Sequence, residues 1–238
     1  MSQIKKEKIS IIIPVFNEHE SIGKVLEAIP DFLIDEVLVV DNGSIDGSDE
    51  VARKHGATVI YESERGYGAA CLKGIAYLQD FRSPCIIVFM DGDYSDYPED
   101  AIQLVEKIRD GHDFVLGSRV LGVKLGQAHL ALHSVLGNKL VTLLLNLLFG
   151  GNYTDLGPFR AIKFEKLLQL EMADRNYGWT VEMQIKALQN HLKILEIPVR
   201  YRKRFGGKSK VTGSLGGSIK AFIKISSIIF LYFFRRKK

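Results

Sequence analysis

Asp91, Gly92 and Asp93 follow directly on six apolar residues, Cys85 to Met90, and this junction offers the clearest chemistry in the sequence. An apolar run of this length with β-branched and aromatic residues is typical of a strand buried on both faces. Two carboxylates at the end of such a strand repel each other unless a cation neutralises them, and Gly92 lets a ligand approach the backbone closely. Hard oxygen ligands suit Mg²⁺ or Mn²⁺, which binds one or two carboxylates together with substrate phosphates. The motif predicts either a divalent metal site or a solvated acidic turn.

Two further polar clusters follow apolar runs. Asn17 and Glu18 come after the run 9–15, and the sequence Asp-Asn-Gly-Ser at 41–44 follows the run 36–40. Each cluster alone is explained by a turn, since these residue types form turns for reasons unrelated to ligands. If the runs are parallel strands of one sheet, however, all three clusters lie at the same edge, where ligands bind. The combination therefore favours one shared ligand site.

The apolar spacing predicts alternating elements that would position these clusters. Strands are expected over 9–15, 36–40, 57–61, 85–90, 113–116 and 192–199, and helices over 18–29, 48–55, 68–78, 98–109, 132–149 and 215–234. Strands that alternate with helices of this length are typical of an α/β protein with a doubly wound, mostly parallel sheet. The chain of 238 residues is long enough for one large domain or a domain with an appendage.

Several classes of protein are not supported. No G-x-G-x-x-G motif follows the first strand, and no Walker A motif occurs, so neither a Rossmann dinucleotide site nor a P-loop is expected. Cys71 and Cys85 have no paired spacing, which indicates a reducing compartment and argues against structural zinc. Residues 1–8 are polar and lack the apolar core of a signal peptide, so we expect a location inside the cell.

The charges are divided unevenly along the chain. Residues 1–196 hold 20 Lys and Arg against 28 Asp and Glu, whereas residues 197–238 hold 12 Lys and Arg and no acid; the totals of 32 and 28 give the net charge of +4. A basic segment favours an anionic partner, either phosphate groups, an acidic membrane surface or nucleic acid. Nucleic acid is not expected, because the segment lacks a recognition module and ends in an apolar run.

Two apolar helices bear on location. In the helix expected over 215–234, Lys220, Lys224 and Ser227 share one stripe, and the mainly apolar part 225–234 spans about 15 Å, about half of what crosses a bilayer. We expect an amphipathic helix on an anionic membrane surface. The alternatives are a helix docked on the domain or a dimer contact in a homo-oligomer. The helix expected over 132–149 is also more apolar than a surface helix needs, unless it is buried in the core.

Seven motifs together resemble a known family. Three resemble motifs of family 2 glycosyltransferases of the GT-A fold, namely Pro14-Val-Phe-Asn-Glu18, Val39-Val-Asp-Asn-Gly-Ser44 and Asp91-Gly-Asp93. The others resemble the dolichyl-phosphate mannose and polyprenyl-phosphate hexose synthase branch, namely Gly117-Ser-Arg119, Asp155-Leu-Gly-Pro-Phe-Arg160, Gly178-Trp-Thr-Val-Glu182 and Arg204-Phe-Gly-Gly-Lys-Ser-Lys210. The resemblance covers residues 8–213. It implies a catalytic domain over 1–213, followed by the basic amphipathic helix in 214–238.

The resemblance also implies roles in donor binding. Pro14, Phe16 and Glu18 would line the nucleotide pocket, with Val40, Asp41 and Asn42 beside the base and ribose. Asn42 stands where the family commonly has a second Asp, and its amide both donates and accepts, so the identity of the base stays open.

The diphosphate end would be held by charged residues. Asp91 and Asp93, with Gly92 between them, would bind Mg²⁺ or Mn²⁺; Ser95 stands where relatives often have a Gln ligand. The resemblance implies that Arg119, Arg204 and Lys210 bind phosphate, and Gly206-Gly207 beside Lys208 would let a loop close and exclude water. Arg160 is expected to form a salt bridge that supports the sheet.

The implied reaction is a metal-dependent, inverting transfer of a hexose. The donor would be a UDP- or GDP-linked sugar and the acceptor a polyprenyl or dolichyl phosphate, at the cytoplasmic face of a membrane that the protein contacts peripherally or monotopically. An anionic phosphate acceptor needs no strong base, whereas a hydroxyl of a glycolipid or polysaccharide does, and Glu182 is then the candidate. A non-catalytic membrane regulator that binds nucleotide sugars is a further alternative. Nucleotidyl transfer is not favoured, because no glycine-rich loop with Arg and Lys follows the first strand.

Overall fold

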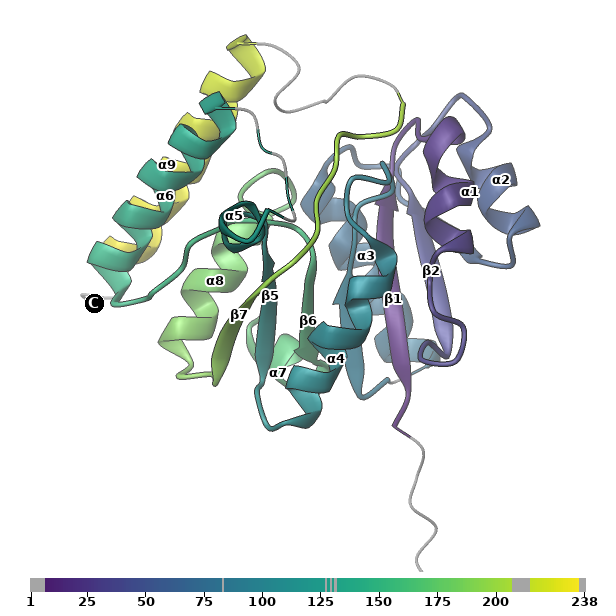
Figure 1. Cartoon of the computed structure of the whole chain (residues 1–238), viewed down its shortest axis with the longest axis horizontal. Helices are drawn as coiled ribbons and strands as arrows, with labels where there is room; N and C mark the ends of the chain where they lie inside the picture. Colours follow the sequence, from purple (N-terminus) through teal and green to yellow (C-terminus); the bar gives the residue numbers. More distant parts are fainter. Residues whose placement is uncertain are drawn as a thin grey trace, which may run out of the picture.

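The computed structural model describes residues 7–82, 84–126, 128, 130, 132–206 and 215–235. Within them a central sheet has the strand order β3-β2-β1-β4-β6-β5-β7 (Figure 1). Its strands are β1 (Ile9–Val15), β2 (Glu36–Asp41), β3 (Thr58–Tyr61), β4 (Ile86–Phe89), β5 (Phe114–Ser118), β6 (Arg160–Lys163) and β7 (Ile194–Pro198). β1 pairs in parallel with β2 and β4, β2 with β3, and β5 with β7. The expected mostly parallel α/β sheet is confirmed.

β6 is an exception that the sequence pattern did not predict. It lies between β4 and β5 and runs antiparallel to both. At its start Arg160 is fully buried and donates hydrogen bonds to the carbonyl oxygens of Thr180, at 3.0 Å, and of Gly157. Its guanidinium also lies 5.7 Å from the centre of the Phe114 ring. Arg160 therefore supports the sheet as expected, but in the described part of the chain it does so through carbonyl oxygens and a ring rather than a salt bridge.

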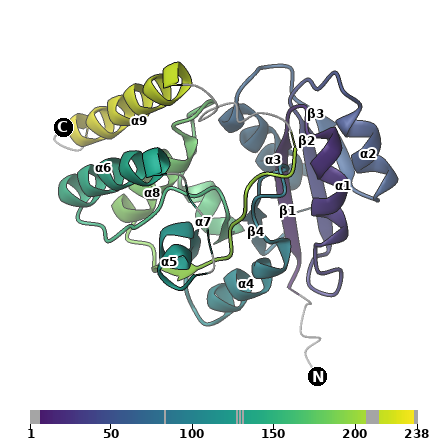
Figure 2. The ribbon, with the colours of Figure 1, turned by 45° about the horizontal axis from the view of Figure 1, so that its top comes forward.

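The helices lie on both faces of the sheet (Figures 1 and 2). They are α1 (His19–Glu27), α2 (Ser48–Lys54), α3 (Tyr67–Phe81), the short 3₁₀ turn η1 (Pro98–Asp100), α4 (Ala101–Arg109), α5 (Arg119–Lys124), α6 (Leu132–Phe149), α7 (Phe164–Gln169), α8 (Trp179–Gln189) and α9 (Leu215–Arg235). The helix expected over 98–109 is divided into η1 and α4. The short helices α5 and α7 were not predicted.

The core consists of two apolar layers, one on each face of the sheet. β1 contributes to both: Ile12 packs with residues of α3, α6 and α8, whereas Ile11 and Ile13 pack with residues of α1 and α4. This division follows from the alternation of side chains along a strand. All three isoleucines are fully buried. The two layers cover the faces of the sheet but not the carboxyl ends of its strands, so polar side chains can lie at that edge.

The helix α9 packs beside α6 and α8, and Figure 2 shows α6 and α9 side by side. Its Ile228 and Ile229 are buried. One face of α9 is therefore docked on the rest of the protein, which was the alternative to a helix that lies only on a membrane. The boundary expected after residue 213 and the side chain of Lys220 lie outside the described residues.

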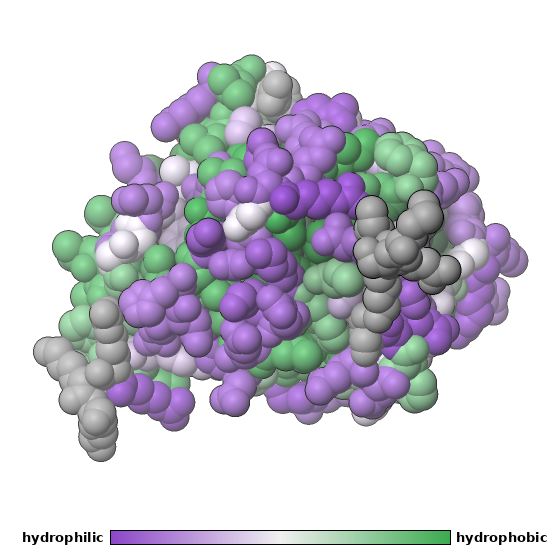
Figure 3. All heavy atoms as spheres, turned by 90° about the horizontal axis from the view of Figure 1, so that it is seen from below, coloured by the Kyte–Doolittle hydropathy of each residue, from purple (hydrophilic) through white to green (hydrophobic). Residues whose placement is uncertain are grey.

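Apolar side chains remain exposed on this pair of helices. They are Leu136, Leu140, Leu143 and Leu147 of α6 and Ile223, Phe230, Leu231 and Phe234 of α9. By contrast, the face of the molecule at the amino ends of the parallel strands is covered mostly by hydrophilic side chains (Figure 3). No helix within the described residues combines the length and apolar character that crossing a bilayer requires.

Candidate functional site

The polar clusters after β1, β2 and β4 meet at one edge of the sheet. The ends of β1 and β2 are in register, with Val15 beside Asp41, and the amide of Asn42 donates to the carbonyl oxygen of Val15 at 2.8 Å. On the other side, the amide of Met90 donates to Ile12 at 3.2 Å, so Asp91 leaves β4 next to β1. The predicted convergence of the three clusters is confirmed.

Side-chain hydrogen bonds hold the loops after β1 and β2 together. The amide of Asn17 donates to the hydroxyl of Ser44 at 3.0 Å, and the amide of Ile45 donates to the side-chain oxygen of Asn17 at 2.9 Å. Asn17 has φ of 53°, in the left-handed region that Asn tolerates better than most residues. These contacts fix the backbone on both sides of Phe16, a residue of the expected nucleotide pocket.

The residues expected to line the nucleotide pocket differ in their exposure. Pro14 and Phe16 are partly exposed, whereas the side chain of Val40 is fully buried and packs in the core beneath the edge. The guanidinium of Arg65 lies 3.6 Å from the centre of the Phe16 ring. Sequence analysis missed Arg65, which follows β3 in a segment without a recognisable motif.

Asp41 and Asn42 make contacts within the protein. A carboxylate oxygen of Asp41 accepts the amide of Ser44 at 3.0 Å. The side-chain amide of Asn42 donates to the carbonyl oxygens of Glu62, at 3.0 Å, and Glu64, at 2.7 Å, and its oxygen accepts the amide of Gly66 at 2.8 Å. These bonds favour a role for Asn42 in shaping the 62–66 segment. Its expected contact with a base stays a prediction.

Asp91 and Asp93 lie close together in a region of negative electrostatic potential. Burial, and next the carboxylate of Asp93, raise the pKa of Asp91 to about 7. One oxygen of Asp93 accepts the amide of Ser95 at 2.9 Å. Between them, a Cβ on Gly92 would lie 3.0 Å from a methyl carbon of Val15, so the turn packs closely on β1. Such a carboxylate pair is stabilised when a cation binds.

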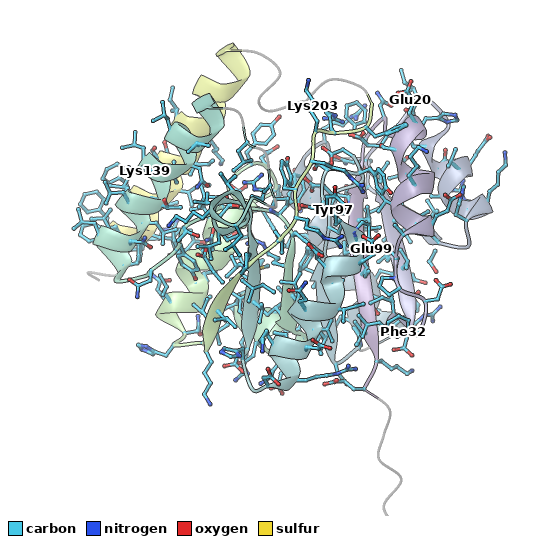
Figure 4. All side chains as sticks on the ribbon, viewed as in Figure 1. Glu20, Phe32, Tyr97, Glu99, Lys139 and Lys203 are labelled. Atoms are coloured by element: carbon cyan, nitrogen blue, oxygen red, sulfur yellow. The ribbon has the colours of Figure 1, made fainter. Side chains whose placement is uncertain are left out.

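The segment 199–206 crosses this turn and brings Arg204 to it. One nitrogen of Arg204 lies 2.7 and 2.8 Å from the two carboxylate oxygens of Glu18, which is mostly buried, and another lies 3.8 Å from Asp93. The amide of Phe205 donates to the carbonyl oxygen of Asp93 at 3.1 Å. Figure 4 shows the neighbouring Lys203 projecting outward from this segment.

Arg119 lies on the far side of the acidic turn. Its guanidinium binds Asp155 through two nitrogens, each at 2.8 Å, in the bidentate geometry of a strong charge-assisted contact. Burial alone would raise the pKa of Asp155, but Arg119 holds it below its usual value. The positive charge of Arg119 also lowers the pKa of Asp91. Arg119 therefore lies within electrostatic reach of the expected phosphate site while Asp155 positions it.

Asp96 is a buried acid that sequence analysis missed. It is 1% exposed, and neither of its carboxylate oxygens has a hydrogen-bond partner among the described residues. Burial first, and then the carboxylates of Asp91 and Asp93, raise the pKa of Asp96 well above its usual value. Its position three residues after Asp93 could have indicated that Asp96 belongs to the site. The sequence Tyr-Ser-Asp-Tyr, however, is typical of an ordinary turn.

These donors fit Mg²⁺ or Mn²⁺. Asp91 and Asp93 offer hard oxygen ligands at a strand end, and the unpartnered oxygens of Asp96 lie within electrostatic reach of both. Within the described ranges no group of three or more His, Cys, Asp or Glu side chains forms a ready metal cage.

Glu182, the candidate base, faces another part of the molecule. It is 1% exposed, and its carboxylate accepts the hydroxyl of Tyr232 at 2.6 Å and the amide of Asp174 at 2.7 Å. Lys186 lies 2.9 Å away. Its role as a base stays a prediction, and these partners favour a positioning role. Lys210, Gly207 and Lys208 lie outside the described residues.

A family model matches most of the chain. The model described as glycosyl transferase family 2 matches residues 10–170. An uncharacterised glycosyltransferase of Mycobacterium tuberculosis is 34% identical over 225 residues, which cover 94% of this chain and 98% of the relative.

Two further relatives have names that specify an acceptor. A dolichyl-phosphate hexose transferase of Haloferax volcanii is 31% identical, with 94% of this chain and 96% of the relative covered. An undecaprenyl-phosphate mannosyltransferase of Micrococcus luteus is 29% identical, with 88% and 90% covered.

Solved structures share the fold. The glucosyl-3-phosphoglycerate synthase of Mycobacterium tuberculosis, in complex with Mn²⁺, UDP and glucosyl-3-phosphoglycerate, matches with a TM-score of 0.71 at 22% identity, over 96% of this chain and 80% of that chain. At this identity the likeness shows the fold alone, and that fold is the expected GT-A arrangement.

Proposed function

This chain belongs to glycosyl transferase family 2, whose members transfer sugars, and we propose that it moves a hexose from a nucleoside-diphosphate sugar to a polyprenyl phosphate. One observation carries the proposal: Asp91 and Asp93 share the carboxyl edge of the sheet with the Glu18–Arg204 pair. Carboxylates for a divalent ion and a guanidinium for a phosphate thus lie together. The names of two relatives support the lipid phosphate as acceptor.

The nucleotide would lie over the loops after β1 and β2. Phe16 and Arg65, stacked at 3.6 Å, offer a flat surface against which a base can pack. Asp41 lies at the end of β2, beside the expected ribose position, and Asn42 keeps the 62–66 segment in place through its hydrogen bonds. UDP and GDP both remain candidate carriers of the sugar.

The diphosphate would lie at the turn formed by Asp91, Gly92 and Asp93. Asp91 and Asp93 would hold a divalent ion there, which would supply positive charge for the diphosphate and for the charge that develops on it as the sugar leaves. Arg204 and Arg119 add fixed positive charge from two sides of the turn. Lys210 would add a further charge.

The chemical step would be a single displacement. An oxygen of the polyprenyl phosphate forms a bond to the anomeric carbon as the bond to the donor phosphate breaks, and the nucleoside diphosphate leaves with the electron pair. The configuration at the anomeric carbon inverts. The acceptor oxygen is already anionic, so no strong base is needed. The engagement of Glu182 by Tyr232 and Lys186 agrees with an acceptor of this kind and disfavours a hydroxyl acceptor.

The exposed apolar side chains of α6 and α9 would rest on the membrane that holds the acceptor. Leu136, Leu140, Leu143 and Leu147 are spaced three or four residues apart, so they form one stripe of α6. α9 adds Phe230, Leu231 and Phe234 together with Arg235, a charge that anionic lipids attract. We propose peripheral contact with the cytoplasmic leaflet.

A transfer assay tests the proposal. Purified protein is incubated with UDP-glucose, GDP-mannose or UDP-GlcNAc, each with polyprenyl phosphate and Mn²⁺, and the lipid-linked sugar is measured. We expect transfer from one of these donors, and a loss of about a hundredfold or more in the Asp93→Asn variant. Asp110→Asn is the matched control, because Asp110 is an exposed acid paired with Lys107 at the far end of α4. Absence of transfer from all three donors would refute the proposal.

A further inference from the structure

We propose that Glu182 is a positioning residue for the donor site: it fixes the loop 173–178 against the start of α3 and, through Tyr232, ties this loop to α9. The loop is defined by residues Ala173 to Gly178, between α7 and α8. The inference rests on the proposed function only in taking the edge at Asp91 as the donor site.

The carboxylate of Glu182 is the centre of a buried network. Its oxygens accept the amides of Ala173, at 3.0 and 3.1 Å, and of Asp174, at 2.7 Å. Lys186 lies 2.9 Å away, and the hydroxyl of Tyr232 donates at 2.6 Å. Burial alone would raise the pKa of Glu182, but the bonds from Lys186 and Tyr232 and the two amides hold it below its usual value. Charge-assisted bonds of this kind are stronger than neutral ones, so Glu182 holds the loop firmly.

A second set of contacts joins the loop to α9. One carboxylate oxygen of Asp174 accepts the amides of Asn176, at 2.8 Å, and Gly178, at 3.0 Å. Its other oxygen lies 3.1 Å from the ammonium of Lys224 in α9. A Cβ on Gly178 would lie 1.7 Å from a methyl carbon of Ile228, so α9 packs directly on the loop backbone. The position of α9 and the shape of the loop therefore depend on each other.

The opposite side of the loop touches the first turn of α3. The carbonyl oxygen of Arg175 accepts the amide of Ala69 at 2.9 Å, which satisfies one of the free amides at the helix start. A Cβ on Gly66 would lie 2.0 Å from this oxygen, and a Cβ on Gly68 would lie 2.0 Å from the carbonyl oxygen of Asp174. Backbone meets backbone without intervening side chains, so a displacement of the loop moves the start of α3.

The start of α3 belongs to the donor site. The amide of Gly66 donates to Asn42 at 2.8 Å. Tyr67, the next residue, packs edge-on against Trp179 with ring centres 6.0 Å apart. Trp179 in turn packs edge-on against Phe89, the last residue of β4 and two residues before Asp91, with ring centres 4.7 Å apart. The loop thus supports Gly66 and Tyr67, which lie beside the expected positions of the nucleotide and the diphosphate.

A coupling between α9 and the donor site follows. Whatever favours the docked position of α9 also favours the loop position that supports Gly66 and Tyr67. If the apolar face of α9 rests on lipid, a membrane strengthens donor binding, and by reciprocity the donor strengthens membrane binding.

Tyr232→Phe tests this coupling, because it removes only the hydroxyl that donates to Glu182. The dissociation constants of UDP and of GDP are measured by calorimetry with Mn²⁺, with and without vesicles of phosphatidylglycerol and phosphatidylcholine. We expect the nucleotide that wild type binds to bind about fivefold more weakly to Tyr232→Phe. The KM for donor should rise by the same factor while kcat stays within about twofold. Vesicles should strengthen binding to wild type more than to the variant.

The control is Tyr77→Phe, which makes the same change at a partly buried tyrosine near the end of α3, away from the carboxyl edge. Lys224→Met and Glu182→Gln are further tests of the same network, and each should weaken nucleotide binding in a protein that still unfolds cooperatively. Amides 66–70 should exchange hydrogen faster in all three variants.

The opposite results are distinct. If Glu182→Gln lowers kcat strongly but leaves nucleotide affinity and the exchange of amides 66–70 unchanged, Glu182 acts as a base and the inference is wrong. Unchanged nucleotide affinity in all three variants also overturns it. If nucleotide binding depends on Tyr232 but no sugar reaches polyprenyl phosphate, the proposed function fails and the positioning role stands.

Discussion

The guanidinium of Arg204 binds the carboxylate of Glu18 at 2.7 and 2.8 Å, although 186 residues separate the two in the sequence. The same guanidinium lies 3.8 Å from Asp93. Arg204 therefore competes for the carboxylate of Asp93 with any divalent ion that binds at this turn. When a diphosphate is present, its oxygens offer Arg204 another partner.

We expect Arg204→Gln to bind Mn²⁺ more tightly than wild type in the absence of nucleotide, by about threefold to tenfold, because a competing positive charge is removed. The same variant should bind nucleoside diphosphate with Mn²⁺ more weakly. Electron paramagnetic resonance of free Mn²⁺ measures the first effect and calorimetry the second. Lys203→Gln is the matched control, since it removes the same charge from the outward-facing neighbour. Equal Mn²⁺ affinities for Arg204→Gln and wild type would contradict the competition.

Binding of Mn²⁺ should depend on the protonation of Asp91. The pKa of this carboxyl is raised from 3.8 to about 7 by burial and the neighbouring Asp93, so a metal must displace a proton below pH 7. We expect the affinity for Mn²⁺ to rise between pH 5 and 7 and to level off above it. Affinity that is constant across this range would show that Asp91 is already ionised.

The same shift predicts a loss of stability with rising pH. The unfolded carboxyl ionises near pH 4 and the folded one near pH 7, so ionisation favours the unfolded state between these values. In EDTA the melting temperature of wild type should fall from pH 4 to pH 7 relative to Asp91→Asn, and Mn²⁺ should restore it most strongly at the higher pH.

Asp96→Asn should make the protein less sensitive to pH. Burial and two nearby carboxylates raise the pKa of Asp96, so its ionisation destabilises the fold above the usual pKa of an aspartate. Urea unfolding in EDTA at pH 5 and pH 8 should show the variant gaining stability relative to wild type at the higher pH, by about 1 kcal/mol or more. An equal difference at the two pH values would mean that Asp96 has no raised pKa.

Two glycine substitutions should have opposite effects. In Gly68→Ala the new methyl would lie 2.0 Å from a backbone oxygen of Asp174, so we expect a loss of about 1–3 kcal/mol together with weaker nucleotide binding. In Gly137→Ala, within α6, the methyl would meet nothing within 4 Å, and a gain of about 0.5–1 kcal/mol is expected. Chemical denaturation of both variants checks this pair.

Membrane contact should depend on the stripe of α6. Leu143 is 62% exposed, so Leu143→Glu should fold normally, while vesicles that contain phosphatidylglycerol should retain it less than wild type in a sedimentation assay. Phe32→Glu is the control, because Phe32 is 79% exposed near the opposite end of the sheet (Figure 4). Equal retention of all three proteins would exclude this face as the membrane contact.

The sequence was sufficient for the features that depend on periodicity and on strand order. β1 to β5 lie where their apolar runs predicted, and Asp91 and Asp93 share an edge with Glu18 because parallel strands align their carboxyl ends. Asn42 shows the limit of this inference. Its amide is used by Glu62, Glu64 and Gly66, and these partners could not be read from local sequence.

Other features depend on long-range packing that no local pattern records. β6 has only four residues, Arg-Ala-Ile-Lys, and becomes a strand because β4 and β5 flank it. Glu182 was a candidate base because of its motif, yet its carboxylate meets Tyr232, which lies 50 residues later on a helix whose docked position the sequence left open.

The reversed direction of β6 decides which insertions the enzyme can accept near its site. Because β6 runs against its neighbours, the loop that enters it, and not the loop that leaves it, lies at the carboxyl edge. Asp155 reaches Arg119 from this entering loop. Related enzymes that lengthen the segment 150–159 would therefore remodel the rim of the site, whereas additions after Lys163 would fall at the far edge. The loop that enters β6 can thus change in length while the register of β1, β2 and β4 stays the same.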